Sequence, residues 1–172
     1  MENKVIKTIK TRVSCRAYSE KRVSLKKAMM VAEAGKFAPS GKNRQIANIY
    51  VVNSKAKVEK LRNLSLQIGG RDCMYGAKTV LLVGGPREDR FTNQDCSCVL
   101  ENMFLATHAL KLNSCWINQF DDLFNTKDGL KVKKSLNIPE DQQIVGACIL
   151  GYAKDGVSPE PKPRKEDFIK VI

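Results

Sequence analysis

The segment that most constrains the fold is a long run of helix-forming residues in the middle of the chain, from Asn93 to Leu112. Its apolar side chains recur at helical spacing and cover one broad face: Val99, Leu100, Met103, Phe104, Ala106, Leu110 and Leu112. Thr92 and Asp95 have the spacing of a capping box, which predicts the start of this helix. This apolar face is wider than packing against one neighbouring element requires. Such a helix is central to a core or shared with a second subunit.

Shorter elements flank this helix in irregular order. We predict helices over residues 3–11, 24–37 and 128–136, and another that begins at Ser54. We predict strands over 46–52, 79–83, 114–119 and 143–151, and a loop over 65–77. Strict βαβ alternation is missing, which favours an α+β fold over a doubly wound sheet. The tail from Ala153 onward is too rich in proline and glycine to pack alone and should lie extended on something.

Length and composition predict a single domain that spans residues 1–172. No run of about 18 apolar residues is present, and the first residues do not resemble a secretory signal. We therefore expect a cytoplasmic protein with no membrane partner. The six cysteines form no C-x-x-C pair and there is a single histidine, so we expect reduced structural thiols and no metal site.

The net charge of +12 is concentrated in the first quarter of the chain. Residues 1–44 hold 12 of the 30 basic residues and three acidic ones, a net charge of +9. A positive field of this kind attracts ligands that carry phosphate. It also leaves open a basic domain that binds nucleic acid, although the aromatic share of 6% argues against a stacking platform for single strands.

Familiar catalytic motifs are missing from the sequence. Residues 35–43 resemble a P-loop, but one residue too many separates the glycines and Asn43 stands where a P-loop has serine or threonine. A helix is also predicted before this segment, where a P-loop follows a strand. No G-x-G-x-x-G follows a predicted strand. A Ser-His or Cys-His mechanism would need His108, which lies inside the long helix with no motif around it. The chemistry therefore points to a bound cofactor.

Three separated polar segments suit flavin mononucleotide (FMN). Arg12 and Arg16 can neutralise a phosphate or the N1/O2 edge of a flavin, and Ser14 can bond to ribityl or phosphate oxygens. Asn43 and Gln45, after the Pro39-Ser40-Gly41 turn, can pair with the edge of a pyrimidine ring. The third segment is the basic end of the tail, Lys162-Pro163-Arg164.

At this point the chain resembles the nitroreductase family of FMN-dependent oxidoreductases. The resemblance rests on R-x-S-x-R at 12–16, A-P-S-G-x-N-x-Q at 38–45, the run at 100–110 and Ser114-Cys115-Trp116-Ile117. It extends to the I-P-E run at 138–140, the L-G-Y run at 150–152 and Arg164. The resemblance implies a nitroreductase-like α+β fold with a central mixed or antiparallel sheet flanked by helices. It also implies a homodimer whose interface holds the long helix, the C-terminal tail and two FMN sites.

The resemblance also implies the role of each site residue. Arg12, Val13, Ser14 and Arg16 of one subunit would hold phosphate, ribityl and the N1/O2 edge. The partner would supply Pro39, Ser40, Gly41 and Asn43. A backbone N–H near Ile117 or Asn118 would face flavin N5, and Lys162 or Arg164 would close on the phosphate. NADH or NADPH would then transfer hydride to N5, and a nitroaromatic, quinone or flavin acceptor would take the electrons.

The chain departs from the family pattern at several positions. Ile46 stands where the family has proline, Ala47 where an aromatic residue often follows, and Asn113 and Asn118 where it has glycine. These departures leave open a flavin-binding member with different chemistry, such as flavin handling or dehalogenation. The short region before residue 79 leaves little room for a helical lid, so the substrate pocket is expected to be open.

Overall fold

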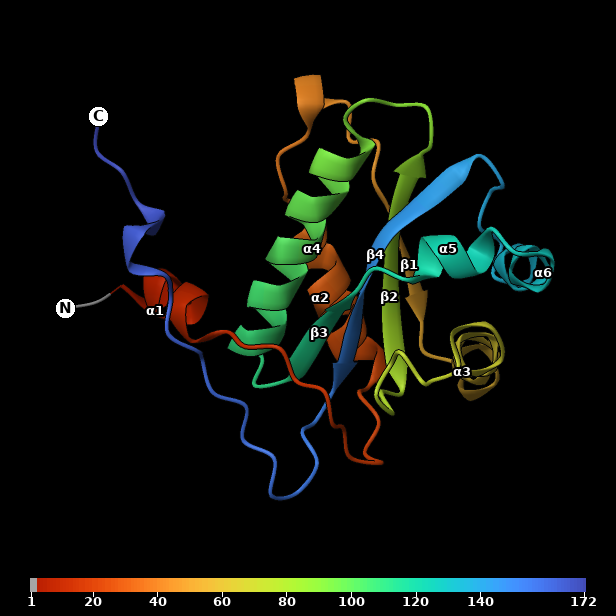
Figure 1. Cartoon of the computed structure of the whole chain (residues 1–172), viewed down its shortest axis with the longest axis horizontal. Coiled ribbons are helices and arrows are strands. Elements are labelled where there is room, and N and C mark those ends of the chain that lie inside the picture. Colours follow the sequence, from red (N-terminus) through yellow and green to blue (C-terminus); the bar gives the residue numbers. More distant parts are fainter. Residues whose placement is uncertain (1–2) are drawn as a thin grey trace.

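The computed structural model describes residues 3–172 as a four-stranded sheet with helices on both faces (Figure 1). The strands are β1 (Asn48–Val52), β2 (Thr79–Pro86), β3 (Asn113–Ile117) and β4 (Gln142–Gly151). They lie in the order β1-β2-β4-β3, and every neighbouring pair is antiparallel. The helices are α1 (Lys4–Thr11), α2 (Leu25–Lys36), α3 (Lys55–Gly69), α4 (Thr92–Ala109), α5 (Phe120–Phe124) and α6 (Lys127–Ser135), with 3₁₀ turns η1 (Gly41–Asn43) and η2 (Glu166–Phe168). The predicted α+β class is confirmed.

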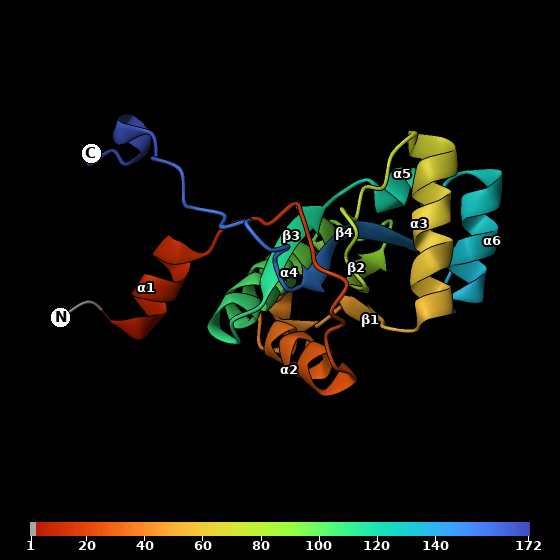
Figure 2. The same ribbon diagram turned by 90° about the horizontal axis from the view of Figure 1, so that it is seen from below.

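Each face of the sheet is covered by its own layer of helices (Figures 1 and 2). On one face, α2 and α4 pack through Val31, Leu100 and Met103 against Leu81 and Leu150 of the central strands. On the other face, α3, α5 and α6 lie over Leu82 and Ile149. The central strands are buried on both sides, which explains why β2 reads as a continuous apolar run.

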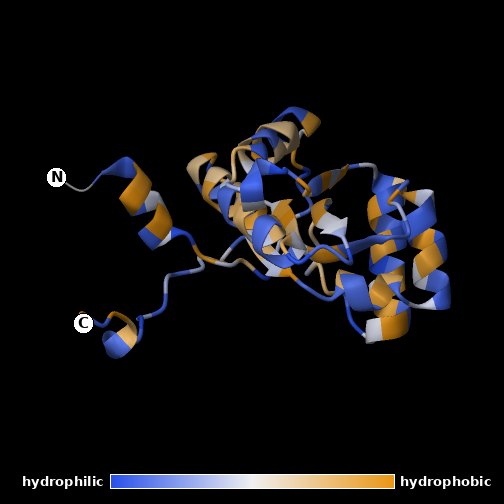
Figure 3. Ribbon diagram, turned by 90° about the horizontal axis from the view of Figure 1, so that it is seen from above, coloured by the Kyte–Doolittle hydropathy of each residue, from blue (hydrophilic) through white to orange (hydrophobic). Residues whose placement is uncertain are grey.

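Both ends of the chain extend away from these layers (Figures 2 and 3). Helix α1 buries none of its side chains, and its apolar residues Val5, Ile6 and Ile9 are about half exposed or more. The tail carries exposed Phe168 and Ile169 near its end. Exposed apolar surface of this kind is typical of an interaction site.

Three local predictions were wrong for identifiable reasons. Residues 65–69 belong to α3 rather than to a loop, because the helix continues until Gly70 adopts a left-handed φ of 68°. The short helix α5 was missed, since its five residues carry too little periodicity to detect. The predicted capping box does not form: the Thr92 hydroxyl donates to Pro86 O, and Asp95 bonds to Gly41. The last difference leads to the site described below.

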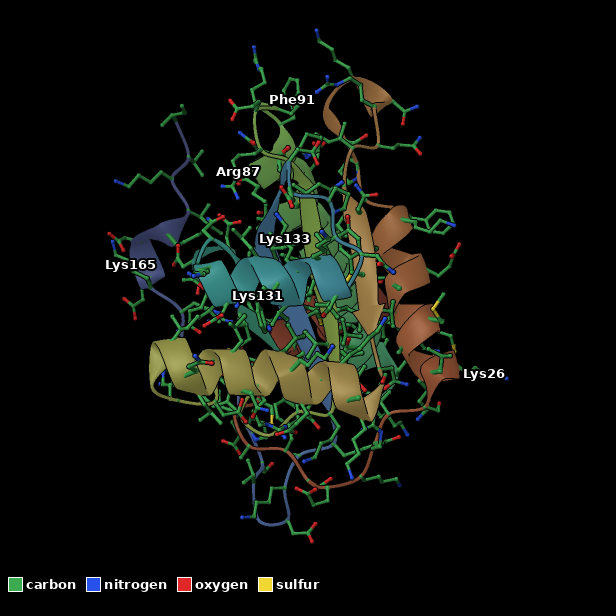
Figure 4. All side chains as sticks on the ribbon, turned by 90° about the vertical axis from the view of Figure 1, so that its right-hand side faces the viewer. Lys26, Arg87, Phe91, Lys131, Lys133 and Lys165 are labelled. Carbon is green, nitrogen blue, oxygen red and sulfur yellow. The ribbon has the colours of Figure 1, made fainter. Side chains whose placement is uncertain are left out.

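A buried lysine joins α6 to the start of β4 (Figure 4). Lys133 is 2% exposed, and its ammonium donates to the carbonyls of Glu140 (2.9 Å) and Gln142 (2.6 Å). Burial lowers the pKa of Lys133, with Arg87 nearby adding to the effect. One side chain thus bonds to two backbone carbonyls, one just before β4 and one at its first residue.

Among residues 3–172, no helix is both long and apolar enough to cross a membrane.

Candidate functional site

A cationic groove lies where the segment after α1 meets the C-terminal tail. Its cavity has a volume of about 460 Å³. The lining residues are Arg12, Val13, Ser14, Arg16, Pro159, Glu160, Pro161, Lys162 and Arg164. Four of these are cationic and one is acidic, and within residues 3–172 none of the four cations forms a salt bridge. The groove therefore has a positive potential with unpaired guanidinium and ammonium groups, which suits a phosphate.

The edge strand β3 fixes the first half of this groove. Ser14 forms a parallel bridge with Ser114, and the Cys15 amide donates to the Ser114 carbonyl at 2.9 Å. Cys15 and Tyr18 are buried in the core, so the segment is anchored on one side. Alternation along an extended chain then turns Ser14 and Arg16 away from the core. The sequence R-x-S-x-R thus presents its polar residues on one edge.

Two aromatic rings form a row that begins at Arg12. The Arg12 guanidinium carbon is 5.9 Å from the centre of the Phe104 ring, a cation–π distance. The Phe104 ring is 5.8 Å from the Trp116 ring, which is 38% exposed. A Cβ at Gly146 would lie 2.7 Å from Trp116 Nε1, so a glycine is needed on β4 at this point. Phe104 is itself buried, and neither ring lines the groove.

The second polar cluster is the turn formed by residues 38–45. Ser40 Oγ accepts a bond from the Gln45 amide at 3.0 Å, and the Asn43 amide donates to Ser40 O at 3.0 Å. Lys42, Asn43 and Gln45 have φ values of 55°, 54° and 52°. Three non-glycine residues in the left-handed region within one turn are uncommon, and such backbone strain tends to occur at functional sites.

The start of α4 holds this turn in place. The Gly41 amide donates to Asp95 Oδ1 at 2.9 Å. A Cβ at Gly41 would lie 2.6 Å from the Phe91 ring, so the backbone reaches Asp95 only because residue 41 is glycine. Arg44 forms an ion pair with Asp89. A bond from the Phe91 amide, and then the Arg44 partner, hold the pKa of Asp89 below its usual value.

The groove and the turn lie toward opposite ends of α4. The turn is bonded to Asp95 near the start of the helix, whereas Thr11, next to the groove, lies 2.8 Å from His108 Nε2 near its end. Thirteen residues of α-helix separate these anchors, a distance of about 20 Å. One chain therefore brings together six of the predicted residues: Arg12, Val13, Ser14, Arg16, Lys162 and Arg164. It keeps Pro39, Ser40, Gly41, Asn43 and Gln45 apart from them.

The remaining predicted residues lie at the end of β3. Ile117 is buried and pairs with Ala147 of β4, while Asn118 follows the strand with an exposed side chain. Neither lines the groove. Their predicted backbone contact with a flavin stays a prediction.

Sequence reasoning missed the residue that holds the turn and the two aromatic rings in the row that begins at Arg12. Asp95 was read as a helix cap, yet it bonds across 54 positions to the turn. Phe104 was assigned to the core face, and Trp116 was read only as part of a strand motif. A single tryptophan next to a strand end is a usable signal, but the partner of Asp95 depends on tertiary structure.

The fold and these two clusters define an α+β protein with a cationic groove and a strained turn. Comparisons with known proteins identify the class more closely. A model of the nitroreductase family matches residues 9–69 and 69–152, so the chain belongs to the nitroreductase family.

Individual relatives agree with this assignment. The chain is 26% identical over 155 residues to a putative NADH dehydrogenase/NAD(P)H nitroreductase of Archaeoglobus fulgidus. The alignment covers 87% of this chain and 86% of the relative. A nitroreductase from Bacteroides fragilis, solved with bound FMN, superposes with a TM-score of 0.92 at 31% identity, over 99% of this chain and 100% of that one. A putative nitroreductase from Desulfovibrio desulfuricans in complex with FMN superposes with a TM-score of 0.73 at 27% identity. The superposition covers 95% of this chain and 94% of that one.

Proposed function

We propose that this chain is an FMN-dependent oxidoreductase. It would take a hydride from NADH or NADPH and deliver electrons to a small oxidised acceptor of the nitroaromatic, quinone or flavin class. Family membership and the FMN-bound relatives support the enzyme class and the cofactor. The acceptor class and the hydride donor rest on the family resemblance and on the name of the archaeal relative. When bound, FMN supplies a hydride acceptor, which none of the amino-acid side chains provides.

The groove fits the phosphate of FMN, its ribityl chain and the adjoining N1/O2 edge of the ring. Arg12, Arg16, Lys162 and Arg164 offer unpaired cationic donors around one cavity, and Ser14 adds a hydroxyl. Arg and Lys donors to a phosphate form charge-assisted bonds, which are about twice as strong as neutral ones. The unpaired cations of the groove are the observation that carries the proposal.

A second copy of the chain would complete each site. Within one chain the groove and the turn lie apart, because the bond of the turn to Asp95 and that of Thr11 to His108 are about 20 Å apart along α4. The apolar residues of α1 and of the tail need a cover, and so does a hollow of about 540 Å³ between α1, α2 and α4, where Phe37 is 79% exposed. A homodimer would cover these surfaces and bring the partner's turn to the groove.

Within such a site the protein would position the flavin and the substrates and polarise the flavin ring. No side chain would act as a nucleophile. Arg16 would place positive charge beside the ring edge that gains electrons, which favours the reduced state. The turn, fixed by Asp95, would present backbone groups and the amides of Asn43 and Gln45 in one geometry. The proposed enzyme acts in the cytoplasm, where NAD(P)H is available and the six free cysteines remain reduced.

The visible spectrum of the purified protein tests the proposal. We expect flavin absorption near one FMN per chain, bleaching when NADH or NADPH is added without oxygen, and return of the colour when a quinone or nitroaromatic acceptor follows. A yellow protein that neither nucleotide reduces would favour the flavin-handling alternative. A colourless protein that takes up no added FMN and binds DNA or RNA with steep salt dependence would overturn the proposal.

A further inference from the structure

One end of the molecule gathers basic side chains that outnumber the acidic ones. It is the end at which α2 begins and β4 ends, and Figure 2 shows the molecule from this side. Glu20 and Asp155 are the acidic residues of the segments that meet here. The basic residues of this surface, the basic end, are Lys21, Arg22, Lys26, Lys27, Lys55, Lys78 and Lys154.

Contacts between segments far apart in the sequence hold the basic end together. The Lys154 amide donates to the Ala17 carbonyl at 3.1 Å, so the start of the tail lies along the segment after α1. Lys21 and Lys27 lie over one aromatic ring, with their ammonium nitrogens 4.7 Å and 5.6 Å from the centre of Tyr152. Positive charges from α2, the tail and the segment between them therefore share one surface.

A polar cavity of about 250 Å³ continues this surface toward α3. Arg22, Lys55 and Lys78 are among its lining residues. Lys78 is paired with Glu20 at 3.0 Å. Among residues 3–172, none of the other basic side chains of the basic end forms a salt bridge. The basic end thus has a positive potential that the chain itself does not neutralise.

The basic end adjoins the cationic groove. Arg16 lines the groove, and Lys21 follows it by five residues, a span of at most about 17 Å. The tail makes the same connection, because Lys154 precedes Pro159 of the groove by five residues. Even a weak protein complex buries about 600 Å² on each partner. A protein docked on the basic end would therefore also reach the groove.

The character of the surface favours an acidic protein over a nucleic acid. Lys21 and Lys27 lie over the Tyr152 ring, so a base could stack there only by displacing a lysine. Leu25 and Val157 are the large apolar side chains exposed near these charges. A charged surface with little apolar area suits the weak, electrostatically steered complexes that electron-transfer proteins form.

We propose that the basic end docks a small acidic electron carrier, which would reduce the flavin as an alternative to NADH or NADPH. The inference rests on the proposed function, because the carrier needs a flavin beside its docking surface. Two reduced carriers would each give up one electron. These two electrons and one proton from water equal the hydride that a nicotinamide nucleotide supplies, and two oxidised carriers leave.

A plant-type [2Fe–2S] ferredoxin is a suitable acidic probe, and titration calorimetry measures its docking without turnover. We expect saturable binding to the purified protein that weakens at least about tenfold between roughly 20 mM and 200 mM salt, because salt screens surface charges. A basic c-type cytochrome should not bind. Reduced ferredoxin, added without oxygen, should bleach the flavin absorption.

Two double variants locate the docking surface. Lys26→Glu/Lys154→Glu reverses two exposed charges of the basic end (Figure 4 labels Lys26) and should weaken ferredoxin binding at least about tenfold. Its flavin content and its reduction by NADH or NADPH should not change, since neither residue lines the groove. Lys127→Glu/Lys134→Glu makes the same change in net charge at exposed positions of α6, and it should bind ferredoxin like the wild type.

The outcomes separate this inference from the proposed function. Equal binding by the two double variants would overturn the inference alone, and so would a protein that NADH or NADPH reduces but that does not bind ferredoxin. Salt-dependent binding of duplex DNA without binding of ferredoxin would also overturn it. A protein that takes up no FMN would overturn the proposed function and the inference with it. The comparison of ferredoxin with the cytochrome needs no variant and remains decisive if a variant fails to fold.

Discussion

Single charges in the groove have measurable consequences if the groove holds FMN. Arg16 is exposed and unpaired in the described part of the chain, so replacing it removes a ligand contact and little else. We expect Arg16→Ala to weaken FMN binding roughly 10- to 100-fold, the loss expected for one bond to a charged group. The midpoint potential of the flavin should fall by about 30 mV for each 1.4 kcal/mol of lost stabilisation of the reduced state.

Fluorescence titration of flavin-free protein and anaerobic redox titration measure these two quantities. Lys26→Ala is the matched control, because Lys26 is an exposed cation on α2 that does not line the groove (Figure 4). If Arg16→Ala and Lys26→Ala have the same affinity and the same potential, Arg16 has no role in the site.

The buried thiols predict a loss of stability in alkaline solution. Burial, with a contribution from the Asp95 carboxylate, raises the pKa of Cys96 to about 12, and burial also raises the pKa values of Cys115 and Cys148. A thiol with a raised folded pKa stabilises the fold fully below the unfolded pKa, near 9, and this stability is lost as the pH rises through the folded value. Each such thiol lowers the free energy of unfolding by about 1.4 kcal/mol per pH unit in that range.

Urea unfolding between pH 8 and 10.5, in the presence of a reductant, tests this effect. As the pH rises, the free energy of unfolding should fall less steeply for Cys96→Ala than for the wild type. The difference between the two slopes should equal the contribution of one thiol. Cys98→Ala removes an exposed cysteine two residues away and should leave the slope unchanged. A wild-type stability that stays flat above pH 9 would show that these thiols ionise equally in both states.

At the scale of elements, the attachment of α6 to β4 depends on one ammonium group. Replacing Lys133 by methionine keeps the volume but leaves the carbonyls of Glu140 and Gln142 without their donor. We expect Lys133→Met to lower the free energy of unfolding by about 1–3 kcal/mol, the cost of unsatisfied buried acceptors. Lys131→Met alters an exposed lysine of the same helix, paired only with Asp128 on the surface, and should change stability by less than about 0.5 kcal/mol. Equal effects in chemical denaturation would contradict the role given to Lys133.

The elements also show what the sequence could and could not predict. Period and apolar content were enough to find α4 and all four strands, because most of these elements bury an apolar face. The predicted end of α4 at Leu112 was wrong: the helix ends at Ala109, and Lys111 has a left-handed φ of 55°. The bounds of α3 and the existence of α5 depend on a left-handed glycine and on contacts from the core, which leave no periodic signal. The six groove residues could be named from motifs. The link from Asp95 to Gly41 could not, because the capping spacing satisfied a local rule and the competing partner lies 54 positions away.

For the whole molecule, the two clusters predict that a flavin site works only across two chains. One variant, Arg12→Ala/Arg16→Ala, would disable the groove. Another, Gly41→Ala, would disable the turn, since the new Cβ would lie 2.6 Å from the Phe91 ring. Each homodimer alone would bind FMN poorly at both of its sites. A mixed dimer, however, would pair the intact groove of one chain with the intact turn of the other and so regain one site.

Mixing the two variants, unfolding them and refolding them together should therefore restore FMN binding to about a quarter of the sites, because half of randomly paired dimers are mixed and each regains one of two sites. Refolding the wild type by the same route sets the full value, and separate refolding of each variant sets the background. Gly69→Ala, where a Cβ meets no atom within 4 Å, controls for adding a methyl group at a glycine. If the mixture binds no more FMN than the separate variants, although light scattering shows dimers, each chain holds its flavin alone. The groove and the turn would then serve different ligands.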